Sequence, residues 1–136
     1  MNLKNLKDLN ILYVEDDKVV QDLFSTILSK VFAHVSIASD GKEGLDFFIN
    51  NKYKYDFVVS DVKMPELDGL EMIEKIKEVD PSIPCILITA HGEFDYFMKA
   101  NEIGVYRYIQ KPLDINELFE AINDFQSGLE VKKIDL

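Results

Sequence analysis

Short apolar runs alternate with segments of helical periodicity along the whole chain, and this alternation limits the fold more than any other feature. The apolar runs predict strands at 9–14, 34–38, 57–60, 84–89 and 105–109. Between and after them, apolar residues recur at helical spacing in 19–31, 41–50, 70–79, 94–103 and 115–125. Five β/α units with short connections predict one α/β domain, with a parallel sheet covered by helices on both faces.

The size and charge of the chain exclude several classes of protein. Its 136 residues suit a single domain, and a net charge of -10 argues against direct binding to nucleic acid. No apolar run approaches the roughly 20 residues that span a bilayer, and the first residues lack the apolar core of a secretory signal. The single cysteine, Cys85, lies among aliphatic residues in "PCILIT" and is predicted to be buried. These features favour a cytoplasmic protein without a membrane partner.

Several polar residues are predicted to begin or end helices. Asp17 is expected to cap the helix that starts at Lys18, and Asp68 the helix that follows Gly69. Asp114 is expected to cap the last helix, with Glu117 as its capping-box partner. Gly104 and the Ser127-Gly128 pair are predicted helix stops.

The remaining polar residues of interest follow the strands directly. Glu15 and Asp16 come after the first strand, Asp61 after the third, Thr89 ends the fourth and Lys111 follows the fifth. In an open α/β sheet, ligands bind outside the carboxyl ends of the strands. If the strands concerned are neighbours, these side chains share one small basin.

Clustered carboxylates repel one another, and a hard divalent cation removes that conflict. Mg²⁺ prefers oxygen ligands and commonly uses one or two carboxylates together with a phosphate oxygen. Lys111 can neutralise a phosphoryl group, and Thr89 can donate a hydrogen bond to it. Asp61 can be the nucleophile, since carboxylates form aspartyl-phosphates. The basin therefore predicts phosphoryl chemistry at Asp61.

Four segments, "ILYVEDD", "VVSDVKMPELDG", "ILITA" and "YIQKP", resemble the receiver domain of two-component response regulators. They occur in that order from Ile11 to Pro112, each at the end of a predicted strand. The resemblance implies a doubly wound, flavodoxin-like (βα)5 fold with strand order 2-1-3-4-5. It also implies that residues 1–126 form the receiver domain and that 127–136 are a C-terminal tail or the start of a linker.

The resemblance further implies a role for each site residue. Asp61 is the expected phosphoacceptor, assisted by Thr89 and Lys111 as the other catalytic residues. The expected Mg²⁺ ligands, with Mn²⁺ as a substitute, are Glu15, Asp16, Asp61 and the backbone carbonyl of Lys63. Thr89 and Tyr108 are the expected switch residues, and a cis peptide is expected between Lys111 and Pro112.

The implied function is phosphorylation-dependent signalling rather than enzymatic turnover. The expected partners are a sensor histidine kinase or phosphotransfer protein, and a downstream protein or output domain. The latter would bind the face formed by the fourth helix, the fifth strand and the fifth helix, and a homodimer through the same face is a further hypothesis. Whether the chain stands alone or belongs to a longer protein stays open.

Three alternatives use a similar sheet. An aspartate-dependent phosphohydrolase usually needs a second Asp two residues after the nucleophile, where this chain has Lys63. A flavin-binding module needs a hydroxyl- and Gly-rich loop after the first strand, where this chain has three acids. A phosphorylation-independent interaction module on the receiver fold typically lacks one of the acidic or lysine positions, and all of them are present here.

The fourth helix carries more apolar side chains than one buried face requires. Phe94, Tyr96, Phe97 and Met98 wrap around more than one side of "EFDYFMKANEI". Two interpretations are open: some of them form a partner surface together with Tyr106, or the helix simply has a wide buried face.

Overall fold

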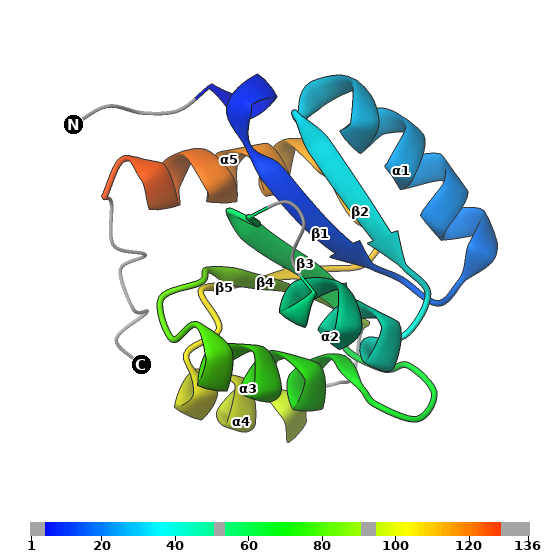
Figure 1. The fold of residues 1–136 in the computed structure, drawn as a ribbon, viewed down its shortest axis with the longest axis vertical. Helices are drawn as coiled ribbons and strands as arrows, with labels where there is room; N and C mark the ends of the chain where they lie inside the picture. Colours follow the sequence, from blue (N-terminus) through cyan, green and yellow to red (C-terminus); the bar gives the residue numbers. More distant parts are fainter. Residues whose placement is uncertain (1–4, 51–53, 91–94, 129–136) are drawn as a thin grey trace.

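The computed structural model of the chain describes residues 5–50, 54–90 and 95–128. Five strands form one parallel sheet in the order β2-β1-β3-β4-β5 (Figure 1). The strands are β1 (Asn10–Val14), β2 (His34–Ala38), β3 (Phe57–Asp61), β4 (Cys85–Thr89) and β5 (Arg107–Gln110). The predicted fold class and strand order are confirmed.

Two layers of helices enclose the sheet. They are α1 (Lys18–Val31), α2 (Gly41–Ile49), α3 (Gly69–Val79), α4 (Asp95–Ile103) and α5 (Ile115–Gln126), and a short 3₁₀ turn, Leu6–Asp8, precedes β1. α1 and α5 pack on one face, around a cluster that contains Tyr13 and Ile122. α2, α3 and α4 cover the other face, around a cluster that contains Leu12 and Ile73 (Figure 1). Because both faces are covered, β3 is buried along its whole length.

Aspartate caps fix where several helices begin. Asp17 accepts hydrogen bonds from the amides of Val19 and Val20, which confirms it as the cap of α1. Asp68 and Glu71 form a reciprocal capping box at the start of α3. This box places α3 directly after the loop that follows Asp61, so the loop between β3 and α3 is short and held at both ends.

The helix stops and the cis peptide also follow the predictions. Gly104 follows α4 with a φ of 84°, and Gly128 follows α5 with a φ of 68°. Both lie in the left-handed region that glycine tolerates best. The Lys111–Pro112 peptide is cis.

The structure corrects two local predictions. β5 begins at Arg107 rather than Val105, because the Val105 amide bonds back to the Ala100 carbonyl and closes the turn after α4. Asp114 caps α5 by accepting from the Asn116 amide, one residue earlier than a capping box with Glu117 requires. Neither correction concerns a predicted site residue, whereas β3 extends one residue beyond its predicted end and includes Asp61.

α4 is only partly buried. Tyr96 packs against the core, whereas Phe97 is 36% and Met98 is 65% exposed; Phe94 lies outside the described residues. The outward side of α4 thus carries apolar surface, as one of the two interpretations requires. Among the described helices, none combines the length and the hydropathy that crossing a bilayer demands.

Candidate functional site

The sheet topology brings the carboxyl ends of β1, β3, β4 and β5 together. β3 lies between β1 and β4, and the register pairs Val14 with Ser60, and Asp61 with Ile88. Beyond β4, Thr89 pairs with Gln110, the residue before Lys111. The side chains predicted to form one basin therefore leave the same edge of the sheet.

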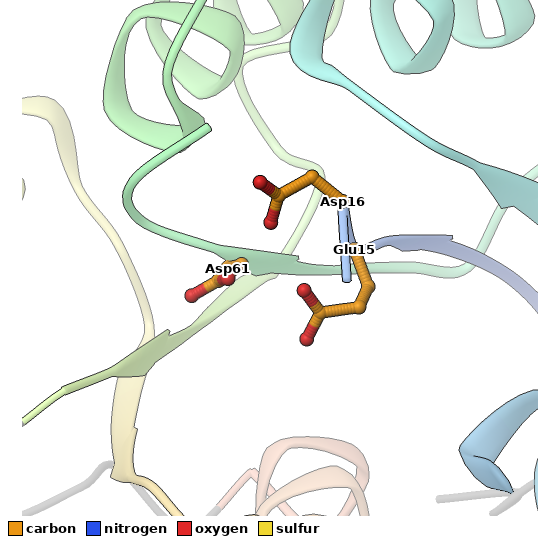
Figure 2. A group of neighbouring side chains, drawn as sticks. All are labelled: Glu15, Asp16 and Asp61. Atoms are coloured by element: carbon orange, nitrogen blue, oxygen red, sulfur yellow. The ribbon is translucent and has the colours of Figure 1, made fainter. Parts of the chain in front are cut away.

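Three carboxylates meet at this edge. Glu15, Asp16 and Asp61 each place an oxygen within 4.8 Å of the oxygens of the other two. Glu15 and Asp61 are only 2% and 4% exposed, while Asp16 faces solvent. Figure 2 shows Glu15 and Asp16 leaving the end of β1 on opposite sides of the chain, with both carboxylates on the side of Asp61. Asp16 is therefore the solvent-exposed member of the cluster.

Lys111 reaches the same cluster from β5. Its Nζ lies 2.8 Å from Oδ2 of Asp61, while Oδ1 of Asp61 accepts a hydrogen bond of 3.0 Å from the Val62 amide. The Lys111 amide donates to the Thr89 carbonyl at 2.7 Å, which ties the residue to the end of β4. Asp61 is therefore held at both oxygens, and its lysine partner is fixed by a neighbouring strand.

Burial makes the negative charge of this cluster costly. Burial is the largest cause of a rise in the pKa of Glu15 from 4.5 to about 7, and the negative charge of Asp61 contributes to that rise. The hydrogen bond that the Glu15 carboxylate accepts from the Asp17 amide, at 3.1 Å, acts in the opposite direction. A cation beside these carboxylates would relieve the conflict.

The donor set suits a hard divalent cation. Three carboxylates supply oxygen ligands, and the described residues hold no histidine or cysteine in the cluster. Such ligands fit Mg²⁺ or Mn²⁺ rather than zinc, which favours nitrogen and sulfur. Glu15, Asp16 and Asp61 are thus the residues that could hold the ion, whereas the role of the Lys63 carbonyl stays a prediction.

The loop after β3 borders the site with an open cleft. A cleft of about 440 Å³ lies beside Asp16, and its lining is formed by Asp16, Lys63, Met64, Pro65, Asp68, Glu71 and Tyr96. The Lys63 ammonium lies 5.9 Å from the centre of the Tyr96 ring. Gly69 packs so closely under this loop that a Cβ would overlap the Asp61 carbonyl, which explains the glycine.

The two predicted switch residues lie on β4 and β5. Thr89 is half-buried at the end of β4. Tyr108 pairs with Leu87 of β4, and both pack in the cluster beneath α2, α3 and α4. Since side chains two residues apart on a strand share a face, Thr89 and Tyr108 project toward the same helical layer.

Sequence reasoning missed one residue that shapes the site. Gln21 of α1 is 5% exposed, and its amide nitrogen donates to the carbonyl of Glu15 at 2.9 Å. The same nitrogen contacts the Ala38 carbonyl and the Ser39 hydroxyl. Gln21 thereby joins the loops after β1 and β2. The available signal was its position seven residues before Leu28, on the buried side of α1.

The chain matches the family described as "Response regulator receiver domain" over residues 11–123. It is 36% identical over 118 residues to the transcriptional regulatory protein GlrR of Escherichia coli, covering 87% of this chain but 26% of GlrR. It is 32% identical to sporulation initiation phosphotransferase F of Bacillus subtilis, covering 85% of this chain and 91% of that protein.

Solved structures are similar to this chain in fold and sequence. The N-terminal domain of an uncharacterized protein from Wolinella succinogenes superposes with a TM-score of 0.79 at 39% identity, covering 88% of this chain and 94% of that one. A response regulator receiver domain protein from Clostridium thermocellum gives a TM-score of 0.81 at 30% identity, covering 88% and 95%.

Proposed function

Because the chain belongs to the response regulator receiver family of two-component signalling, we propose that Asp61 accepts a phosphoryl group from a histidine kinase or a phosphotransfer protein. A receiver domain is a signalling module rather than an enzyme, and receiver domains bind Mg²⁺. The observation that carries the proposal is the placement of Asp61, 2.8 Å from Lys111 and beside two further carboxylates.

The proposed transfer is a displacement at phosphorus. An Asp61 oxygen forms the new O–P bond while the P–N bond to the donor histidine breaks, and the bonding electrons leave with the imidazole. Glu15, Asp16 and Asp61 would hold Mg²⁺, which when bound neutralises charge on the phosphoryl oxygens. Lys111, already paired with Asp61, is placed to pair with a phosphoryl oxygen instead.

The phosphoryl group is proposed to change the α4–β5–α5 face. A hydrogen bond to it would draw the Thr89 hydroxyl toward Asp61, which frees space on the face that Thr89 shares with Tyr108. Tyr108 then turns inward, and the equilibrium shifts between two existing arrangements of this face. A downstream protein or an output domain would read the change.

The test uses acetyl phosphate as the donor, with Mg²⁺ present. Asp61→Asn should abolish labelling, whereas Asp46→Asn, a change of an exposed aspartate on α2, should leave it at the wild-type level. Labelling should also require Mg²⁺ and disappear with EDTA. Asp61→Asn protein labelled as well as the wild type would refute the proposal.

A further inference from the structure

The hydroxyl of Tyr108 is held by α4. It donates a hydrogen bond of 3.0 Å to Oδ1 of Asn101 and lies 3.3 Å from the carbonyl oxygen of Phe97. Both contacts are at the protein surface, although the ring itself is half-buried. Burial raises the pKa of Tyr108 to about 12, so the hydroxyl keeps its proton and acts as the donor at neutral pH.

The two α4 residues form a clamp on one side of the helix. Phe97 and Asn101 are four residues apart and therefore share a face. The Phe97 ring lies against the Tyr108 ring, with centroids 4.8 Å apart and planes inclined by 36°. One turn of α4 thus contacts Tyr108 three times: ring to ring, hydroxyl to side chain, and hydroxyl to backbone.

We propose that Asn101 is a positioning residue that, together with Phe97, holds Tyr108 in its resting position and so sets how readily the receiver switches. The inference rests on the proposed function, in which Tyr108 turns inward when Asp61 carries a phosphoryl group. That rotation takes the hydroxyl away from Asn101 and the ring away from Phe97. All three contacts stabilise the resting state, and phosphate binding must overcome them.

The clamp has a measurable consequence through linkage. A ligand that binds only the switched state has an apparent affinity reduced by the fraction of molecules in that state. Removing a contact made only in the resting state raises this fraction and therefore tightens binding. For one neutral hydrogen bond the expected change is roughly 2- to 10-fold. General destabilisation would weaken binding instead, so the direction separates the two causes.

The test titrates beryllofluoride, a phosphoryl mimic, into the full chain with saturating Mg²⁺, followed by ¹H–¹⁵N NMR. Asn101→Ala should lower the half-saturation concentration by roughly 2- to 10-fold. Asn101→Asp keeps an oxygen acceptor in place, and its charge strengthens the hydrogen bond from Tyr108, so the half-saturation concentration should not fall below that of the wild type. Asn123→Ala, at an exposed asparagine in the corresponding last turn of α5, is the matched control and should show no change.

A second variant addresses the same hydrogen bond from its other end. Tyr108→Phe removes the donor, so adding Asn101→Ala to it should change the affinity for beryllofluoride by much less than Asn101→Ala does alone. Equal effects in both backgrounds, or an unchanged or weaker affinity in Asn101→Ala protein, would overturn the clamp. Wild-type protein that ignores beryllofluoride would instead overturn the proposed function itself.

Discussion

Glu15 carries a carboxylate that the fold keeps away from water and places beside another acid. Unfolded chains lose the Glu15 proton near the ordinary pKa of 4.5, while the folded protein keeps it until about 7. Metal-free stability is therefore expected to fall as the pH rises from about 4.5 to about 7. Above about pH 7 the ionised Glu15 lowers the free energy of unfolding by its full amount, which a shift of this size limits to at most about 3 kcal/mol.

Replacing this acid should therefore stabilise the metal-free protein. In EDTA at pH 8, Glu15→Gln is expected to raise the free energy of unfolding by about 1–3 kcal/mol, with little gain at pH 4.5. Urea denaturation across this range measures the difference, and Glu74→Gln, at an exposed glutamate of α3, is the control. A gain that does not depend on pH would contradict the assigned cause.

Glu66 has a strained backbone conformation. It is an exposed residue of the loop after β3 and has a φ of 66°, in the left-handed region that costs a side chain roughly 1–2 kcal/mol. Asparagine tolerates this region better, so Glu66→Asn should stabilise the protein by about 0.5–1 kcal/mol. Glu66→Ala removes the same charge but keeps the unfavourable backbone. Thermal melting compares the two variants. Equal melting temperatures would contradict the prediction, because only the asparagine is expected to relieve the backbone strain.

At the scale of helices and strands, the sequence predicted most boundaries because local chemistry determines them. The bounds of β2 match the predicted strand at His34–Ala38, and α1 and α3 begin directly after the aspartates expected to cap them. The start of β5 was missed because Val105 has a strand-forming side chain, yet its amide is used to close α4. A hydrogen bond of the turn after α4 overrode the strand preference of the side chain there.

Gln21 of α1 supports the loop after β1 through its hydrogen bond to the Glu15 carbonyl. Gln21→Met keeps the volume of the side chain but leaves the Glu15 carbonyl without its Gln21 donor, at an expected cost of about 1–3 kcal/mol. The loop that carries Glu15 and Asp16 should loosen, so Mg²⁺ binding should weaken as well. Tyrosine fluorescence can follow the titration, since the chain has six tyrosines and no tryptophan.

Ser39→Ala provides the comparison for Gln21→Met. It removes only the hydroxyl that Gln21 contacts and leaves both carbonyl contacts intact, so its effects should be smaller. Gln21→Met protein that binds Mg²⁺ as tightly as the wild type would show that the glutamine supports the fold but not the loop.

At the scale of the whole molecule, the site could be anticipated because parallel strands deliver their carboxyl ends to one edge. Asp61 and Lys111 are 50 positions apart, yet strand order alone brings them near each other. Contacts that depend on side-chain conformation could not be anticipated. Gln21 reaches Ala38, and Tyr108 reaches Asn101, through rotamers that no periodicity encodes.

The hydrogen bonds at the end of α5 indicate where the domain can be truncated. α5 is closed by bonds from Ser127 to the Asn123 carbonyl and from Gly128 to the Phe125 carbonyl, so its termination is complete at residue 128. Earlier residues of α5 are integral to the core: Ala121 and Ile122 are fully buried, and Phe125 packs edge-on against Phe57 at 5.4 Å.

A chain ending at residue 128 should therefore melt within about 2 °C of the full chain and keep its response to Mg²⁺ and beryllofluoride. A chain ending at residue 120 should not fold, because it loses the buried turn of α5 and the aromatic contact with Phe57. Circular dichroism melting of both chains makes the comparison. If the chain ending at residue 128 is much less stable than the full chain, the boundary lies beyond residue 128, and the last eight residues belong to the receiver domain.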